Sequence, residues 1–287
     1  MILELPKEDF PKISHLLGDF SHYLVLPALL EGRTRGRIWV NDLEEPTTAL
    51  VWDKLNAFFY LTGNSSDSVL NKELSSLIED TIYPEVIQLQ YRNFFLQFTP
   101  QTWDTQVEVI LKGSLPDRRF INFYRLNTSH ANTMLNEAIM PPAGYEMTRI
   151  TDELLSHTDL ENLTEVAYCI RACWQSTDHY LNNGGIGYCL LTRGAIASWC
   201  STDYVVGNTC EMYVETFEGH KEKGFGILTA SACIQACIAR GFTVHWHCFK
   251  DNLGSVKIAE KIGFSKIAEC PIYVVRRQKR QIYKIAH

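Results

Sequence analysis

Apolar and polar residues alternate along residues 210–216, and the apolar residues that follow recur at helical spacing. The first segment is rich in β-branched and aromatic residues, which favours a β-strand. From Ile227 to Arg240, isoleucine and leucine recur with the period of a helix, and Gly241 stands where helices commonly end. The pattern therefore predicts a strand, a short loop with glycines and lysines, and then a helix.

The same periodicities predict elements along the rest of the chain. In the first half they predict a short helix, three strands, a helix, a strand, a helix and a strand, at residues 6–17, 37–41, 47–52, 57–62, 67–80, 93–98, 102–111 and 119–125. In the second half they predict a strand, a long helix and two strands before the central strand, at residues 145–150, 159–181, 188–192 and 195–201. A strand at 242–248, a helix after Asn252 and a final strand pair that includes residues 276–280 complete the prediction.

A stretch with two prolines and a glycine, residues 140–144, resists both helix and central strand. It predicts a boundary between an N-terminal domain, residues 1–142, and a C-terminal domain, residues 143–287.

The loop before the second-half helix, residues 217–226, is a candidate anion site. A helix N-terminus presents unpaired N–H groups and the positive end of the helix dipole, and phosphate is its usual occupant. A P-loop is excluded because Phe225 and Gly226 stand where Lys and Ser/Thr are needed. A dinucleotide-binding loop is excluded because Thr229 replaces its third glycine. The remaining pattern is [Q/R]-x-x-G-x-[G/A], which Lys221-x-x-Gly224-x-Gly226 matches with lysine in the first position.

A second motif follows at residues 252–264, which read NLGSVKIAEKIGF. This resembles N-x-x-[A/S]-x-x-[L/I]-[Y/A]-E-K-[L/I]-G-F, the second motif of the GNAT acyltransferase superfamily, and the loop resembles the pyrophosphate loop of that superfamily. The resemblance covers residues 211–264 in order and spacing. Thr216, the strand at 245–248, Ser255 and Ala259 make the chain most similar to the zwittermicin A acetyltransferase branch.

The resemblance implies an α+β fold, with the GNAT arrangement of a mixed, mostly antiparallel sheet flanked by helices in the C-terminal half. The N-terminal half has the same order of elements and lacks the pyrophosphate loop, so it is either a degenerate GNAT-like copy or an unrelated α+β domain. The resemblance also implies acetyl-CoA as co-substrate. Its expected binding residues are Thr216, Lys221, Glu222, Lys223, Gly224, Phe225, Gly226, Asn252 and Ser255.

Acyl transfer to an amine needs a base, because the amine is largely protonated at neutral pH. Many GNAT enzymes carry a carboxylate on the central strand, so Glu211 is the expected base and Glu215 the second candidate; a structural role for Glu211 is the alternative. Ala259 stands where many of these enzymes place the tyrosine that protonates the thiolate. Direct transfer in a ternary complex with a small-molecule amine is expected. Acyl transfer through Cys248 and a non-catalytic acyl-CoA sensor remain open.

Composition limits the class of protein, the partners and the cellular compartment that can be expected. The hydrophobic content of 46% and charged content of 21% are typical of a soluble globular protein, and the net charge of −6 argues against a nucleic-acid partner. The start of the chain does not resemble a signal peptide, and residues 23–30 are too short an apolar run to span a membrane. All nine cysteines lie from Cys169 onward, and their odd number indicates a reducing cytoplasm. They read as small buried hydrophobes rather than zinc ligands, so no metal is expected.

Overall fold

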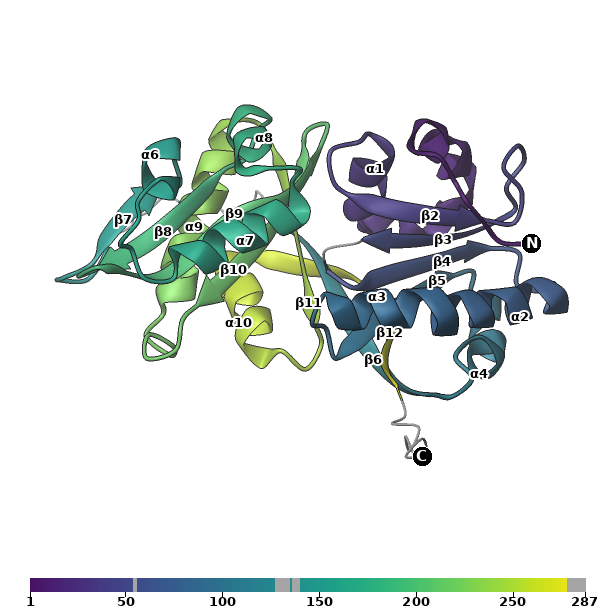
Figure 1. Cartoon of the computed structure of the whole chain (residues 1–287). Coiled ribbons are helices and arrows are strands. Elements are labelled where there is room, and N and C mark those ends of the chain that lie inside the picture. The colour runs from purple at the N-terminus through teal and green to yellow at the C-terminus, as the bar shows by residue number, and fades with distance from the viewer. Residues whose placement is uncertain (54–55, 127–134, 136–139, 278–287) are drawn as a thin grey trace, which may run out of the picture. The chain divides into compact units, whose positions relative to one another are not determined.

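The computed structural model describes residues 1–53, 56–126, 135 and 140–277, which form two compact units (Figure 1). Of these described residues, unit 1 comprises those within Met1–Ser21, Gly36–Arg119 and Pro271–His287, and unit 2 comprises those within His22–Arg35 and Phe120–Cys270. The two units interleave along the chain, because strands β6 (Ser114–Leu126) and β12 (Phe264–Arg277) each contribute residues to both. The predicted domains, 1–142 and 143–287, are contiguous in sequence, whereas these two units are not. That residues 1–142 and 143–287 act as independent domains stays a prediction.

Unit 1 contains a mixed sheet in the order β1-β2-β3-β4-β5-β12. Strands β4 and β5 run parallel and the other neighbours run antiparallel. The first five strands are β1 (Leu3–Glu4), β2 (Gly36–Val40), β3 (Thr48–Asp53), β4 (Phe58–Gly63) and β5 (Asn93–Thr99). The helices are the 3-10 segments η1 (Lys7–Leu16), η2 (Gly18–His22) and η4 (Gln101–Gln106), the π segment η3 (Ile78–Ile82), and α2 (Ser68–Leu77), α3 (Tyr83–Gln88) and α4 (Val107–Ile110).

Stacked aromatic side chains form the core of unit 1. Alternation along β2, β3 and β4 places Trp39, Trp52 and Phe59 on one face, with ring centroids 6.2 Å apart in the first pair and 5.0 Å in the second. Phe94 on β5 meets Phe59 edge to face at 5.2 Å. These four side chains are buried together with apolar residues of α2, α3 and α4. Aromatic burial of this kind provides the largest apolar contribution to the stability of a core.

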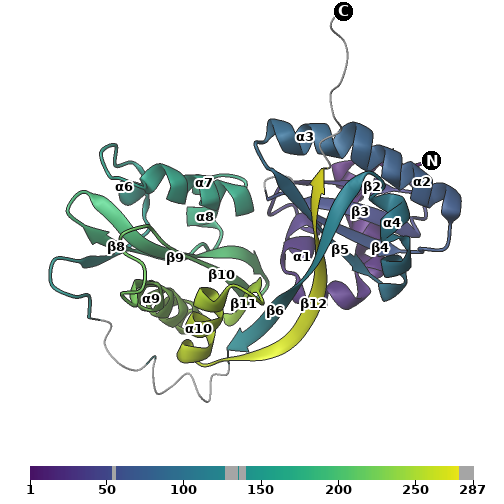
Figure 2. The same ribbon diagram turned by 90° about the horizontal axis from the view of Figure 1, so that it is seen from below.

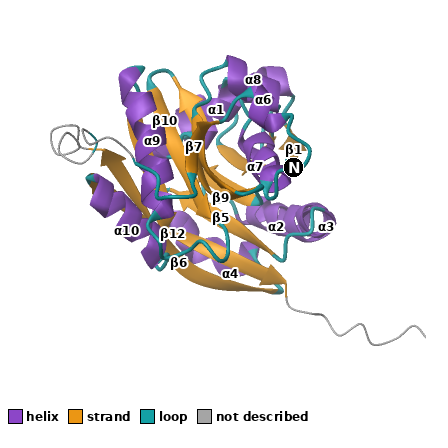
Figure 3. Ribbon diagram, turned by 90° about the vertical axis from the view of Figure 1, so that its left-hand side faces the viewer, coloured by secondary structure: helices purple, strands orange, loops and turns teal. Residues whose placement is uncertain are grey.

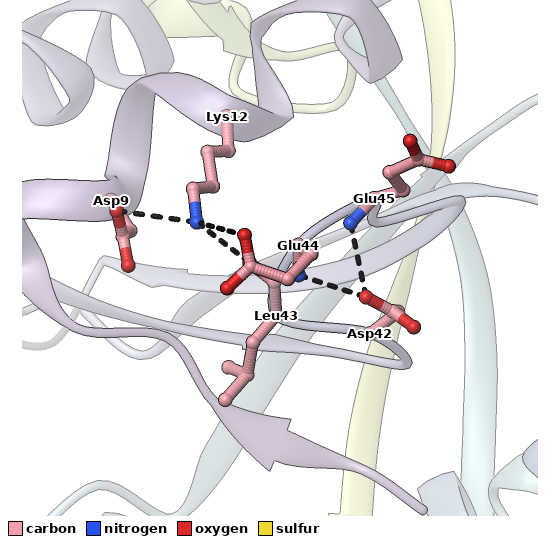
Figure 4. Close-up of polar contacts among 6 residues, drawn as sticks. All are labelled: Asp9, Lys12, Asp42, Leu43, Glu44 and Glu45. Carbon is pink, nitrogen blue, oxygen red and sulfur yellow. Dashed lines mark hydrogen bonds and ion pairs between the residues drawn. The ribbon is translucent and has the colours of Figure 1, made fainter.

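A partly buried lysine connects η1 with the turn between β2 and β3 (Figure 4). The Nζ of Lys12 donates to the carbonyl of Leu43 at 3.0 Å and contacts the carboxylate of Glu44 at 3.4 Å. Within the turn, the Asp42 carboxylate accepts the Glu44 N–H at 2.8 Å. Surface ion pairs contribute little to stability, so this contact mainly orients the turn.

Helix α2 begins with a side-chain cap whose loss should be measurable. The Asp67 carboxylate accepts the N–H groups of Val69 and Leu70 at 2.9 and 3.0 Å. We expect Asp67→Ala to lower the free energy of unfolding by about 1 kcal/mol, because two N–H groups of the first turn lose their acceptor. Urea denaturation measures the change. Asp67→Asn, which keeps the acceptor oxygen, should unfold close to wild type, and an unchanged Asp67→Ala midpoint would show that the cap contributes nothing.

Unit 2 repeats the arrangement of one parallel strand pair in an otherwise antiparallel sheet. The order is β6-β11-β10-β9-β8-β7, and β10 and β11 are the parallel pair. Its strands besides β6 are β7 (Glu146–Arg149), β8 (Gly187–Thr192), β9 (Ala195–Val206), β10 (Thr209–Thr216) and β11 (Thr243–Phe249). Its helices are α1 (Val25–Leu30), α6 (Asp152–Leu155), α7 (Leu163–Cys173), α8 (Thr177–Asn182), α9 (Phe225–Ala239) and α10 (Leu253–Ile262).

Helices cover both faces of the unit 2 sheet. Figure 2 shows α7 and α8 on one face and α9 and α10 on the other. Figure 3, in which helices are purple and strands orange, shows α9 beside β10, and the two elements are in contact. Because both faces are covered, most of the long strand β9 is buried.

The observed elements confirm the predicted α+β class, and the predicted strands follow one another in the predicted order, with β1, α1 and α6 as additional elements. The single long helix predicted at 159–181 is wrong. Trp174 has an extended backbone after α7, and the Ser176 side chain starts α8 by accepting the N–H of His179 at 3.0 Å. The helix predicted at 67–80 continues instead through a π turn to Gln88, and half of the one predicted at 102–111 is a 3-10 helix.

Candidate functional site

The parallel strands of unit 2 separate halfway along their length. Strand β10 pairs with β11 only from Thr209 to Glu211, opposite Thr243 to His245. Beyond this point β10 follows β9 as far as Thr216, and β11 follows β6. The last five residues of β10 therefore present an edge without a strand partner in the described chain.

Backbone polar groups point out of this open edge. The Phe217 N–H donates to the Ala197 carbonyl of β9 at 3.0 Å. Because the direction of N–H and C=O alternates along a strand, the groups of Val214 and Thr216 point to the opposite side, where β11 has diverged. A ligand that carries amides can pair with these groups as an added strand would.

The corresponding parallel pair of unit 1 is closed. Strands β4 and β5 stay paired from Phe58 opposite Phe95 to Thr62 opposite Thr99. The helix that follows β4 is capped by the carboxylate of Asp67. Unit 1 thus offers neither an open edge between its parallel strands nor an unoccupied helix N-terminus after β4.

The loop between β10 and α9 is shaped by three left-handed residues. Gly219, Glu222 and Gly224 have φ angles of 80°, 62° and 79°. In the described structure, the N–H groups of residues 221–226 have no hydrogen-bond acceptor. These groups surround the N-terminus of α9, so the loop can receive several negatively charged oxygens at once.

The two predicted glycines have different tasks. A Cβ on Gly224 would meet no atom within 4 Å, so this position needs glycine for its backbone conformation and leaves the loop surface open. A Cβ on Gly226 would lie 2.9 Å from Cδ1 of Ile258 and 3.3 Å from Oγ1 of Thr216. Gly226 therefore lets the first turn of α9 pack closely against β10 and α10.

Both loop lysines are engaged with the loop itself. The Nζ of Lys221 lies 2.7 Å from a carboxylate oxygen of Glu218, and this partner raises the pKa of the lysine. The Nζ of Lys223 donates to the Gly219 carbonyl at 2.8 Å. The loop carboxylates of Glu218 and Glu222 balance the charges of the two lysines, so the unpaired N–H groups and the helix N-terminus are what favour an anion here. Phe225 is buried against the core, so only its N–H faces the candidate site.

Three other predicted cofactor residues have structural partners. The Asn252 side chain caps α10 by accepting the Ser255 N–H at 3.2 Å, and the Ser255 hydroxyl accepts the indole N–H of Trp246 at 3.0 Å. The hydroxyls of Thr216 and Ser198 lie 2.9 Å apart. Contacts of these three residues with a cofactor stay predictions. Because the Thr216 hydroxyl contacts Ser198, only the backbone of Thr216 is expected to contact the cofactor.

The predicted base Glu211 is buried and bonded to a histidine. Its residue is only 2% exposed, and its Oε1 lies 2.6 Å from Nδ1 of His247 on β11. Burial alone would lower the pKa of His247, but the Glu211 carboxylate outweighs it and the pKa is raised. On β9, Thr202 opposes Met212 and Val205 opposes Cys210, so a bulge with one extra residue lies opposite Glu211. The pair sits where β10 and β11 begin to diverge.

The second candidate, Glu215, lies on the same face of β10 and is half-buried. The Tyr213 hydroxyl donates to its Oε2 at 3.2 Å. Burial and the nearby Glu165 carboxylate raise the pKa of Glu215, and the tyrosine bond only partly offsets them. The predicted alternation along β10 is thus observed, although the face of Glu211 is covered rather than open to solvent.

His247 is a candidate functional residue that the sequence does not single out, because its partner Glu211 is distant along the chain. In the described chain no group of three or more potential ligands is close enough to hold a metal. Cys248 is a poor acyl carrier, since burial raises the pKa of its thiol. Ala259 is fully buried and provides no acid at the position where many GNAT enzymes have a tyrosine.

Among the described helices, none is long and apolar enough to cross a membrane.

Comparison with known proteins agrees with this geometry. The family model described as GNAT acetyltransferase matches residues 14–273. A protein of Bacillus subtilis (strain 168) named uncharacterized N-acetyltransferase YdfB is 22% identical over 273 residues, covering 95% of this chain and 98% of its own length. The sequence similarity thus runs through both units.

Solved structures show the same fold over nearly the whole chain. A GCN5-related N-acetyltransferase-like protein from Streptococcus suis 89/1591 has a TM-score of 0.66 and 21% identity, covering 94% of this chain and 99% of its own. A tandem GNAT protein from the clavulanic acid biosynthesis pathway has a TM-score of 0.58 and 12% identity, covering 98% and 100%. With two GNAT-like units and a family match across both, the chain belongs to the GNAT acetyltransferase family.

Proposed function

We propose that this protein is an acetyl-CoA-dependent N-acetyltransferase that moves the acetyl group to a small-molecule amine by direct transfer in a ternary complex. The observation that carries the proposal is the open edge of β10 leading into a loop of unpaired N–H groups. Together they match the two polar parts of coenzyme A, its pantetheine amides and its pyrophosphate.

Each part of the donor has a counterpart in unit 2. The N–H groups of residues 221–226 and the charges of Lys221 and Lys223 would hold the pyrophosphate, and Val214 and Thr216 would pair with the pantetheine arm. A backbone N–H on the same edge would stabilise the oxyanion that forms when the amine attacks the thioester carbonyl. Glu211 and Glu215 lie on one face of the same strand, β10, and are the candidate groups for removing a proton from the amine.

The acceptor is proposed as a small amine of the aminopolyol kind, on the resemblance to the zwittermicin A acetyltransferase branch. Unit 1, with its closed parallel pair, is proposed to serve acceptor binding or stability rather than acyl-CoA binding. None of the nine cysteines forms a disulfide, which supports a reducing compartment, the cytoplasm. A non-catalytic acyl-CoA sensor is the second candidate, favoured by the absence of a tyrosine at Ala259.

Binding of acetyl-CoA in preference to other phosphate ligands is the first expected result. The loop lacks the lysine and hydroxyl of a P-loop and the third glycine of a dinucleotide site, so ATP and NAD should bind far more weakly. Calorimetry with the three ligands measures this preference, and ATP binding as tight as acetyl-CoA would overturn it. Release of free thiol in a screen of amines would then separate an enzyme from a sensor.

A further inference from the structure

The Glu211 carboxylate is poorly placed to meet a substrate. Glu211 is 2% exposed, whereas the His247 side chain bonded to it is 32% exposed. One carboxylate oxygen is 2.6 Å from the imidazole Nδ1, a short, charge-assisted distance. A group that takes a proton from an acceptor must come within hydrogen-bond reach of it. In this pair the imidazole, and not the carboxylate, has the accessible edge.

The hydrogen bond also decides which imidazole nitrogen can accept a proton. Because Nδ1 of His247 donates to Glu211, the neutral ring carries its lone pair on Nε2. The Phe123 ring packs over the imidazole with centroids 5.7 Å apart and an interplanar angle of 29°. The imidazole is therefore held in one tautomer and one orientation, as in the carboxylate–histidine pairs of hydrolases.

His247 lies on β11 just beyond the point where the two parallel strands part. The last paired residues are Glu211 and His245, and His247 is two residues further on, on the same face of the strand as His245. The open edge of β10 begins at this level of the sheet. Nε2 of His247 thus belongs to the same part of unit 2 as the edge proposed to hold the thioester.

We propose that His247 is the catalytic base of the transferase and that Glu211 is a positioning residue that holds it. Nε2 takes the proton that the ammonium group of the acceptor must lose, directly or through one water. The freed amine nitrogen then forms a bond to the acetyl carbon, and the bond between that carbon and sulfur breaks. The electron pair leaves with coenzyme A as thiolate, which takes the second proton that the nitrogen loses as it becomes an amide. The imidazolium is stabilised by the Glu211 carboxylate until it returns its proton to solvent. The assignment rests on the proposed function.

The surrounding charges set the direction of the pH dependence. The charged and titratable groups around the pair are Asp203 on β9, Arg125 on β6, His245 on β11, and His22 and Tyr23 before α1. Burial lowers the pKa of His247, but the carboxylates of Glu211 and Asp203 raise it above its ordinary value. Since only the neutral imidazole accepts a proton, kcat/KM should rise with pH through this raised pKa. Removing the Glu211 charge should move that rise to lower pH and reduce its plateau.

The test compares His247→Gln, Glu211→Gln and Glu215→Gln in the full chain. We expect His247→Gln to lower kcat by about 10²- to 10⁴-fold, the usual contribution of a positioned base, with acetyl-CoA affinity in calorimetry unchanged. Glu211→Gln should lower kcat by a smaller factor than His247→Gln. NMR titration of the ¹⁵N-labelled histidines should show a lower pKa of His247 in the Glu211→Gln variant. Glu215→Gln tests the competing candidate base, because it removes a half-buried carboxylate from the same face of the same strand.

The possible outcomes separate this inference from the proposed function. If the wild type releases no thiol from acetyl-CoA with any amine, the proposed function and this inference both fail. If the wild type is active and His247→Gln keeps its turnover, only the inference fails. A larger loss in Glu211→Gln than in His247→Gln would return the base to Glu211, and a large loss in Glu215→Gln alone would move it there. An unshifted histidine titration in Glu211→Gln would remove Glu211 from the positioning role.

Discussion

A chain that begins at Pro142 should lose the native fold of unit 2 and, with it, acetyl-CoA binding. Residues 121–125 of β6 pair with residues 245–249 of β11, so the truncation strips β11 of a whole neighbouring strand. It also exposes Trp246 and Cys248, which are buried in the intact sheet. An apolar, unpaired edge of this kind favours aggregation over folding. Circular dichroism, gel filtration and calorimetry together measure the loss.

A shorter truncation provides the control. A chain that begins at Ser114 keeps the whole of β6 and should retain more native structure than the one that begins at Pro142. The expectation is contradicted if the shorter chain is folded, binds acetyl-CoA and acetylates its amine as efficiently as the whole protein. In that case residues 143–287 would be the independent domain that the two prolines predict.

Substitution of Gly224 by valine should remove most of the acetyl-CoA affinity. Gly224 has a φ of 79°, which a β-branched residue adopts only with strain of about 1–3 kcal/mol. Its Cβ would project into the open space beside the N-terminus of α9, where the pyrophosphate is proposed to bind. A valine side chain there would displace the pyrophosphate from N–H groups whose bonds to a charged group contribute about 1.5–3 kcal/mol each. Since about 1.4 kcal/mol is tenfold in Kd, the loss of one such bond weakens binding about tenfold or more. Calorimetry with acetyl-CoA measures it.

The same chain offers a matched control for that strain. Gly207 lies in the turn between β9 and β10, has a φ of 53°, and would likewise place a Cβ in open space. Gly207→Val should lower stability without weakening acetyl-CoA binding. If both variants lost affinity equally, the effect would come from general destabilisation, and if Gly224→Val bound as tightly as wild type, the pyrophosphate would not lie at this loop.

The strands of both units were largely predictable from the sequence because their signal is local. The predicted strand at 93–98 is observed as Asn93–Thr99, and the predicted 57–62 as Phe58–Gly63. Helix α1 was missed because Val25–Leu30 is apolar on nearly every side and has no amphipathic period. The long helix at 159–181 was wrong because Ser176 offers its backbone a competing cap in the middle of an otherwise helical pattern.

The candidate site was predictable only in its contiguous part. The loop at residues 217–226 could be predicted because its glycines and the following helix are neighbours in sequence. The pair of Glu211 and His247 could not, because the two residues are 36 positions apart and meet only through the register of the parallel strands. The interleaving of the units escaped prediction for the same reason, since no local pattern shows that Tyr273 lies opposite Leu96.

The position of β12 has a consequence for synthesis of the chain. Tyr273 to Arg276 pair with Asn93 to Leu96, so the sheet of unit 1 takes its last strand from near the end of the sequence. A ribosome delivers about 5–20 residues per second, and domains commonly fold as they emerge. Here β5 is synthesised roughly ten seconds or more before its neighbouring strand, β12, leaves the ribosome. During that interval β5 presents a free edge, and a nascent chain in this state is the form most in need of a chaperone.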